Sequence, residues 1–446
     1  MKKKIFILMS AIAVLSSCAD QLDVKPFNTI DSGTATSTSK DIEALIVGAY
    51  TFLGDGDVLG GNMQRDAELI GDDGELFWDG TFTDPGEIWD KNMLITNGQA
   101  EATWLDCYRV INICNTVLAN LSVVTADKVD RVEGEAKFIR GVMYFELVKV
   151  YGRTWTDGTP ATNPGVPIVL EPSTTALVDR SSVAEVYTQV ISDLQDAKTL
   201  LPTVNSFFAT TYSASGMLSR VYMMQNDYAN AALEADIVIA SNEFGLLSDY
   251  TDNFNNSANV FSSRNNNENA TTEDVFAIQV TSQSGINNMN TFFSTNGRGD
   301  IYVEQAHLDL YDQVNDERYF LFYDGERTGK WENQFGNVGI IRLAEMYLTR
   351  AEANLQDPGA DVGDSPLNDI NAIRNRAGLG DLGSVTITDI LNERHLELAF
   401  EGHQIHDLKR TGRPVGALAF NAPKLIFPIP NREIIINPDM AQNESY

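Results

Sequence analysis

Cysteine is scarce in this chain of 446 residues, which contains three. Cys18 lies near the N-terminus, whereas Cys107 and Cys114 lie seven positions apart in a segment with a helical pattern. Seven residues of α-helix rise about 10 Å, and a disulfide requires α-carbons within about 7 Å. We therefore expect Cys107 and Cys114 to be buried free thiols, and we expect neither a disulfide framework nor a cysteine-based metal site.

Positive charge and long apolar runs are also scarce. Lys and Arg number 32 against 62 Asp and Glu, which gives a formal net charge of -30. Such a surface repels phosphate backbones, so we expect no binding of nucleic acid. The apolar run from Ile5 to Leu15 is shorter than the stretch of about 20 residues that a membrane-spanning helix needs. No other apolar stretch of the sequence approaches that length.

The sequence lacks the local motifs of several enzyme classes. It has no HExxH zinc motif, and no phosphate-binding glycine loop, serine elbow or cysteine nucleophile stands out. His403 and His406 have a spacing at which both could bind one metal ion. We instead expect His403 to pack beside ion pairs on a helix face, and we expect no metal and no cofactor. The residues expected in those pairs are Glu393, Arg394, Glu397 and Arg410.

The N-terminus has the pattern of a signal for secretion. Lysines at positions 2–4 precede the apolar run, and small residues then lead to Cys18, which predicts a signal peptide over 1–17. The order Leu15, Ser16, Ser17, Cys18 resembles the bacterial lipobox, whose cysteine carries several acyl chains and so holds a membrane stably. Residues 18–40, rich in Thr, Ser and Asp, are expected to form a lipidated tether, and 41–446 the folded body.

Helical periodicity covers about 41–53, 99–151, 182–241 and 339–410, with one continuous helix expected over 386–410. Within 212–241, large and small residues fall at the spacing of a tetratricopeptide repeat, and partial matches occur near 182–200 and 344–373. These repeats predict an all-α fold, a solenoid of about four helix pairs. Polar regions rich in Gly, Asn and aromatic residues, 54–98 and 242–338, are expected to be long irregular insertions that bind a ligand.

An ordered set of motifs along the chain resembles the SusD/RagB family of outer-membrane nutrient-binding lipoproteins. The motifs include Trp104, Tyr108, Ile111 and Asn115; the runs Glu135 to Gly141 and Tyr144 to Val148; Gly165 to Pro167; Arg180 to Val183; Arg342 to Leu348; Arg350 to Ala353; Ile373 to Gly378; Phe400 to Gly402; Asp407 to Arg410; Pro428 to Pro430; and Asn437 with Pro438. The chain departs from the family pattern at Gln404, Ile405 and Ser445, positions that concern packing more than function.

The resemblance implies a helical scaffold with a more irregular half that faces the ligand. Such proteins sit at the cell surface as a lid on a TonB-dependent transporter that resembles SusC, and they hand it oligosaccharides without acting as enzymes. Two alternatives stay open: a peptide ligand, as in RagB-like members of the family, and a glycoside hydrolase. A hydrolase needs two carboxylates about 5 to 10 Å apart, and no local motif nominates such a pair.

Sugar recognition needs flat aromatic faces against CH surfaces, and carboxylates, amides and guanidinium groups for the hydroxyls. The two insertions contain both kinds of group. We expect Trp78 and Trp331 to be the first aromatic contacts, followed by Trp89 and Tyr302. The polar groups expected beside them are Asp72, Asp73, Arg65 and Asn92.

Overall fold

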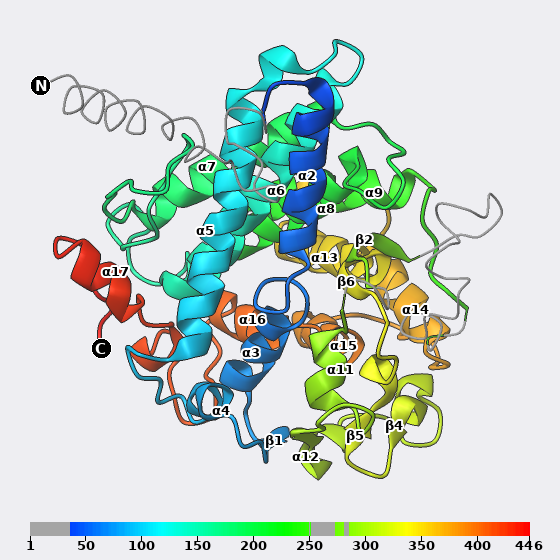
Figure 1. Ribbon diagram of the computed structural model, residues 1–446. Coiled ribbons are helices and arrows are strands. Elements are labelled where there is room, and N and C mark those ends of the chain that lie inside the picture. Colours follow the sequence, from blue (N-terminus) through cyan, green and yellow to red (C-terminus); the bar gives the residue numbers. More distant parts are fainter. Residues whose placement is uncertain (1–35, 249, 251–272, 281–284) are drawn as a thin grey trace, which may run out of the picture.

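A computed structural model describes residues 36–248, 250, 273–280 and 285–446. The expected signal peptide, Cys18 and most of the expected tether lie outside these residues. The described chain is mainly helical, with a few short strands (Figure 1). In the part of the chain that the structure describes, no helix is both long enough and apolar enough to span a bilayer.

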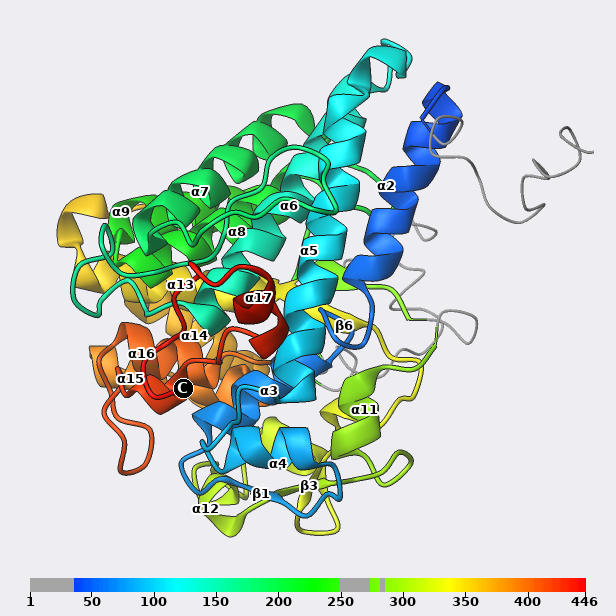
Figure 2. The same cartoon turned by 60° about the vertical axis from the view of Figure 1, so that its left-hand side comes forward.

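Eight helices form the scaffold, and each packs against the next in the series. They pair as α2 with α5, α6 with α7, α8 with α9 and α13 with α14, which confirms the predicted all-α architecture of about four helix pairs (Figures 1 and 2). Their bounds are α2 Ser39–Leu53, α5 Gly98–Ala119, α6 Val129–Tyr151, α7 Val183–Leu200, α8 Thr211–Gln225, α9 Tyr228–Ala240, α13 Leu343–Gln356 and α14 Pro366–Arg376.

Shorter elements complete the described chain. The helices are α3 Asn62–Gly71, α4 Thr83–Trp89, α11 Asn288–Phe293, α12 Gln305–Leu308, α15 Ile387–Glu397, α16 Gln404–Arg410 and α17 Asn431–Ile436. The 3-10 turns are η1 Leu121–Val123, η3 Glu317–Leu321, η4 Gly329–Trp331, η5 Pro358–Ala360 and η6 Pro423–Leu425. Six strands, β1 Leu76–Trp78, β2 Asp274–Ile278, β3 Ile301–Val303, β4 Phe322–Tyr323, β5 Arg327–Thr328 and β6 Val338–Arg342, form the antiparallel pairs β1–β3, β2–β6 and β4–β5.

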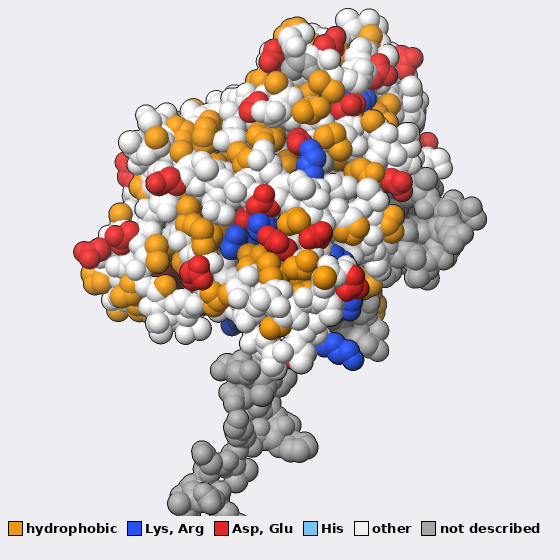
Figure 3. All heavy atoms as spheres, turned by 90° about the horizontal axis from the view of Figure 1, so that it is seen from above, with side chains coloured by type: hydrophobic (Ala, Val, Ile, Leu, Met, Phe, Trp, Pro, Cys, Tyr) orange, Lys and Arg blue, Asp and Glu red, His pale blue; other side chains and the backbone are white. Residues whose placement is uncertain are grey.

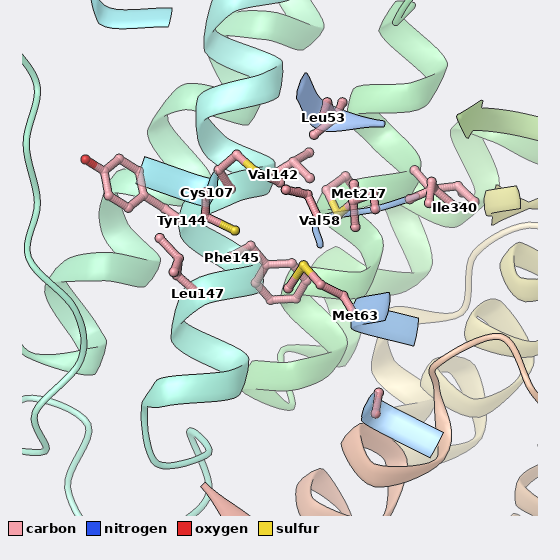
Figure 4. Close-up of a cluster of buried hydrophobic side chains, with 14 of the residues drawn as sticks. Leu53, Val58, Met63, Cys107, Val142, Tyr144, Phe145, Leu147, Met217 and Ile340 are labelled. Atoms are coloured by element: carbon pink, nitrogen blue, oxygen red, sulfur yellow. The ribbon is translucent and has the colours of Figure 1, made fainter. Parts of the chain in front are cut away.

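Apolar packing between helix pairs holds the scaffold together. Gly141 of α6 lets α7 approach closely, because a Cβ at that position would lie 3.1 Å from the Leu194 side chain. Figure 4 shows part of the core, where side chains of α6 meet Leu53, Met63 and Met217. Cys107 and Cys114 are buried there as free thiols, as predicted. Burial raises the pKa of both thiols and keeps them protonated.

Helix α3 lies inside the region 54–98, which the sequence predicts to be irregular. All ten of its residues are buried, polar ones included, so its polar side does not face the solvent. Several of its polar groups find internal partners: Arg65 donates hydrogen bonds to the side chains of Asp66, Asn62 and Gln99. A buried helix of this kind is therefore stabilised by side-chain hydrogen bonds that the sequence pattern does not reveal.

The helix expected over 386–410 is broken in the structure into α15 and α16. Phe400 and Gly402 adopt left-handed backbone conformations, with φ of 62° and 85°. The break turns the carbonyls of Glu397 and Ala399 toward the buried Lys330 Nζ, at 2.9 Å each. The chain leaves the helix here because these carbonyls bind an internal ammonium group.

A buried ionic cluster joins the described part of the second insertion to the scaffold. Arg342 lies 2.7 Å from Glu273, 2.8 Å from Glu401 and 3.2 Å from Glu397. Arg318 lies 2.7 Å from Glu393. These partners come from separate elements, so the expected ion pairs along one helix face are in fact buried contacts between elements.

Arg394 and Arg410 also have buried partners, although the pair of Arg410 with Asp407 lies within α16. Both guanidinium groups bind Asp407, at 2.8 and 2.7 Å, and Arg410 also binds Glu352 of α13. Helix α16 is mostly buried, and the charged residues Glu393, Arg394 and Glu397 lie on the buried face of α15, so these side chains find their partners inside the protein. Paired charges of this kind are costly to bury and more costly to leave unpaired.

Candidate ligand-binding surface

The pairing of β1 with β3 decides which aromatic rings reach the surface. Phe77 lies directly opposite Tyr302 in this antiparallel ladder. Side chains alternate between the two faces of a strand. Leu76 and Trp78 therefore point inward, whereas the Phe77 side chain points outward and is 43% exposed. Figures 1 and 2 both place β1 and α4 at the end of the molecule away from the loop that joins α5 to α6.

Trp89, the last residue of α4, completes a group of three rings with Phe77 and Tyr302. Its ring stands edge-to-face with Phe77 at a centroid distance of 5.6 Å, and Phe77 lies 6.4 Å from Tyr302. Trp89 is half-buried and so keeps part of its ring accessible. We call Phe77, Trp89 and Tyr302 the aromatic platform.

Asp72 holds the platform in place. Its Oδ1 accepts hydrogen bonds from the backbone N–H groups of Gly74, Glu75 and Leu76, at 2.8 to 3.0 Å, and so shapes the turn into β1. Its Oδ2 accepts a hydrogen bond of 3.0 Å from Trp89 Nε1. Burial raises the pKa of the Asp72 carboxyl, although these donors oppose the shift. Asp72 therefore orients Trp89, and both of its oxygens are engaged.

Tyr302 is fixed by a cation on its ring. The Arg327 guanidinium lies 3.6 Å from the centre of the Tyr302 ring. Arg327 is itself held by the carbonyls of Gly299 and Ile301, at 2.8 and 2.6 Å. Such a contact stabilises the ring by about 0.5 to 2 kcal/mol and holds its orientation before any ligand arrives.

Polar groups lie near the platform. Asp73 is exposed in the turn before β1, and Asn92 is exposed after α4, where its Oδ1 accepts a hydrogen bond from Lys424 Nζ at 3.2 Å. Lys91 is half-buried, and burial lowers its pKa against the opposing charges of Asp72 and Asp73. These side chains offer donors and acceptors within the same turn region as the rings.

Another exposed ring, Phe82, lies in the same segment. It is 48% exposed, and the Arg298 guanidinium lies 4.0 Å from its centre. Arg298 also binds Asp300 at 2.7 Å and the Thr81 hydroxyl at 3.1 Å. This contact between the two insertions holds the segment after β1 against the segment before β3.

The structure places three of the expected binding residues elsewhere. Trp78 is 7% exposed because strand alternation turns it toward Phe292. Trp331 is 2% exposed, and its Nε1 donates to the Phe400 carbonyl at 2.9 Å. Arg65 is buried in the hydrogen bonds of α3. The sequence-based choice of Trp78 and Trp331 as leading contacts is thus corrected: both rings pack against protein.

Phe77 is the ring that sequence reasoning left out of its leading candidates. Alternation along β1 exposes the middle residue of Leu76, Phe77 and Trp78, but which residues of this strand face inward is known only from the fold. The expected residues Trp89 and Tyr302 do lie together with it, and Asp72 supports them.

Two other surface regions are less suited to stacking against a ligand. A groove of about 460 Å³ lies between α5 and the C-terminal segment, but its tryptophan, Trp104, is 2% exposed and belongs to the scaffold core. The end of the molecule seen in Figure 3 carries hydrophobic and charged side chains interspersed with uncharged ones. The platform is therefore the better candidate for stacking against a ligand.

Comparison with known proteins identifies the class of this scaffold. A family model described as "Starch-binding associating with outer membrane" matches residues 20–223, and a model described as "SusD family" matches 317–418. The SusD-like protein P2 of Formosa agariphila is 25% identical to the chain, covering 99% of each. The starch-binding protein SusD of Bacteroides thetaiotaomicron is 31% identical over 28% of this chain and 27% of its own length.

A solved structure gives the same result for the fold. A Bacteroides vulgatus protein with a provisional sugar-binding description superposes with a TM-score of 0.83 and 27% identity, covering 93% of this chain and 100% of that one. The fold and the ordered matches thus define a helical, tetratricopeptide-like binding protein. The chain belongs to the SusD/RagB family, whose matched description is one of starch binding in association with the outer membrane.

Proposed function

We propose that this protein is a cell-surface lipoprotein, anchored to the outer membrane through Cys18, that binds oligosaccharides and delivers them to a SusC-like TonB-dependent transporter. The observation that carries the binding proposal is the aromatic platform. Phe77 is an exposed ring that lies between Trp89 and Tyr302. Asp72 holds Trp89 through a hydrogen bond, and the Arg327 guanidinium packs on the Tyr302 ring. Because the rings are already ordered, they lose little conformational entropy when a ligand binds.

The energetics of the platform suit capture followed by release. If three rings each removed about 40 to 50 Å² of sugar CH surface from water, the gain would be about 3 to 4 kcal/mol. That corresponds to a dissociation constant near 1 mM before hydrogen bonds are counted. We propose Asp73 and Asn92 as partners for sugar hydroxyls, since both are exposed near the rings.

A carbohydrate is favoured over a peptide by the relatives. The matched family description and the Bacteroides thetaiotaomicron relative both name starch binding. The platform agrees with this choice, because stacked rings flanked by carboxylate and amide groups match the CH faces and hydroxyls of a sugar.

We propose binding without cleavage. The carboxylate nearest the rings, Asp72, has both oxygens engaged by four N–H donors, which leaves it poorly suited to protonate a glycosidic oxygen. Incubation of an oligosaccharide that binds with the protein should release no new reducing ends. Their appearance in proportion to protein would establish the hydrolase alternative.

The binding proposal is tested by tryptophan fluorescence of a chain that begins at residue 19. All described contacts lie after position 35, so this chain retains them. A panel of oligosaccharides and peptides is titrated into the protein, into Phe77→Ala and into Phe207→Ala. Phe207 is a matched control: it is also a phenylalanine, it is also 43% exposed, and it lies in the loop between α7 and α8.

Saturable binding of one glycan class is expected, weakened about 5- to 10-fold in Phe77→Ala, which loses one of three stacking rings. Phe207→Ala should bind as the parent does. Equal binding in all three proteins would show that the platform is not the site. Saturation by peptides alone would replace the carbohydrate ligand with a peptide.

The anchor is tested separately by Cys18→Ala in cells. We expect the parent protein in the outer-membrane fraction and labelled by a fatty acid, and we expect the variant to be unlabelled and released from that fraction. Equal membrane retention of the two proteins would contradict anchorage through Cys18.

A further inference from the structure

Two histidines and a glutamate from three separate segments meet beside the platform. Glu75 directly precedes β1, His307 lies in α12 after β3, and His395 lies in α15. The backbone N–H of Glu304 donates to the Glu75 carbonyl at 2.8 Å, which fixes Glu75 at the end of the β1–β3 ladder. The three side chains therefore connect the ligand-binding strands to the scaffold.

Their donor atoms converge on one point. Glu75 Oε2 lies 2.6 Å from His307 Nδ1 and 2.8 Å from His395 Nε2, and the three donor atoms all lie within 4.8 Å of one another. Two imidazole nitrogens and one carboxylate oxygen are thus placed together, which is a donor set that transition metals bind in proteins.

The surroundings of His307 match the tautomer of a metal ligand. Tyr311 has one hydroxyl proton, and its oxygen lies 3.2 Å from His307 Nε2 and 3.1 Å from the Leu396 carbonyl. When Nδ1 of a neutral His307 donates to Glu75, both of these acceptors compete for that single proton. When Nδ1 instead binds a metal, Nε2–H donates to Tyr311 and Tyr311 donates to Leu396, so every donor has one acceptor.

This second arrangement is the one found around metal-bound histidines, whose free ring nitrogen donates to a nearby oxygen. A doubly protonated His307 would also satisfy the hydrogen bonds. That state places a charge on an imidazole that is fully buried, which is unfavourable.

The site has an open side. A pocket of about 160 Å³ is lined by Glu75, His395 and Asp73, whereas His307 closes the inner side. An ion can enter from the pocket and keep a water at the fourth position, as three-ligand zinc sites do. Of the two groups of described side chains that place three metal-binding donors together, this one contains imidazoles and the other consists of Asp55, Asp57 and Asp106.

We propose that Glu75, His307 and His395 form a binding site for a transition-metal ion, with Zn²⁺ as the best match to two imidazoles and one carboxylate. Zinc–ligand distances of about 2.0 to 2.1 Å place tetrahedral donors about 3.3 Å apart. When the ion enters, Glu75 Oε2 must therefore move away from the two imidazole nitrogens by about 0.5 to 0.7 Å. Once bound, the ion ties both strands of the β1–β3 ladder to α15 and stiffens the aromatic platform.

The experiment titrates Zn²⁺ by calorimetry, and Co²⁺ by visible absorption, into the untagged chain that begins at residue 19. The variants are His395→Gln and Glu75→Gln, with His403→Gln as a matched control. His403 is a half-buried histidine that lines the same pocket but stands outside the three-residue cluster. Thermal unfolding in excess chelator shows which variants are folded, and a folded Glu75→Gln carries the test if His395→Gln is not.

One Zn²⁺ per chain is expected, with the intense absorption of four-coordinate Co²⁺. Each cluster variant should bind about 100-fold more weakly or worse, whereas His403→Gln should bind as the parent does. The proposal is overturned if the parent binds no stoichiometric ion, if both cluster variants bind as tightly as the parent, or if His403→Gln loses as much affinity as they do. Because the readout is metal binding itself, failure here leaves the glycan proposal intact.

Discussion

The helical scaffold and the platform-bearing insertions are held together by different forces. In the scaffold, apolar faces of successive helices bury one another, and small residues such as Gly141 set the spacing. In the insertions and where they join the scaffold, buried ions and hydrogen bonds hold short elements: Arg342 binds three glutamates, and Asp72 accepts four N–H groups. Conservative substitutions in apolar contacts cost little stability, whereas removing one partner of a buried polar contact leaves the other unsatisfied and costs more.

The largest effect is expected when the buried ionic cluster loses its central cation. Arg342→Ala removes the cation that Glu273, Glu397 and Glu401 share, and leaves these carboxylates with Arg376, Arg318 and Lys330 alone. Removing one partner from a buried ion network costs about 3 to 5 kcal/mol, so urea unfolding should show a loss of that size. The control is Arg432→Ala, because Arg432 is 47% exposed and its pair with Glu433 at 3.3 Å lies at the surface.

Arg432→Ala should change the free energy of unfolding by less than about 1 kcal/mol. A loss of similar size in both variants would mean that the buried ion pairs of Arg342 stabilise the protein no more than a surface ion pair does. That result would contradict the proposed difference between the two regions.

Glu68 of α3 should give the next largest effect, and it should be stabilising. Glu68 is 1% exposed, and burial raises its pKa from 4.5 to about 7, although the Gly402 N–H donates to it. Because the folded pKa is raised, the folded state favours the protonated form. Stability is unaffected below pH 4.5, falls as pH rises from 4.5 to 7, and stays reduced above pH 7.

Glu68→Gln keeps an oxygen for the Gly402 N–H and carries no charge. At pH 8 it should stabilise the protein by about 2 to 3 kcal/mol over the parent, and at pH 4.5 by about zero. Denaturant unfolding of both proteins at the two pH values measures this difference. A gain that is the same at both pH values would show that Glu68 is not charged at a cost in the folded protein.

The same contrast explains what the sequence could predict. The helix pairs could be predicted because apolar residues recur along one face of each helix. The tetratricopeptide spacing of Leu218, Tyr222 and Ala231 predicted α8 and α9, where all three residues are buried. Helix α3 was assigned to an irregular insertion because it is short and lies among polar residues, although all ten of its residues are buried in the fold. The helix break at Phe400 depends on a lysine that lies far away in the sequence.

The candidate site was predictable in composition and less so in geometry. Trp89, Tyr302 and Asp72 do meet in one place, but the outward direction of Phe77 is set by the pairing of β1 with β3, which joins two distant segments. A short strand gives no clear period of its own, so the sequence could not decide which of Phe77 and Trp78 faces outward.

The smallest effect is expected at the hydrogen bond between Asp72 and Trp89, which sharpens the contrast within the platform itself. In Asp72→Asn the side-chain amide can adopt two orientations. Its NH₂ group faces either Trp89 Nε1–H or the backbone N–H groups of the turn, so a donor faces a donor in both cases. In a Trp89→Phe background the first of these clashes disappears, because phenylalanine has no Nε1–H. A double-mutant cycle should therefore give a coupling of about 1 kcal/mol in unfolding free energy. The coupling should also appear in ligand binding, since Asp72 acts on the ligand by orienting Trp89. Coupling in stability without coupling in affinity would make Asp72 a support of the turn alone and would leave Phe77 and Tyr302 as the binding rings.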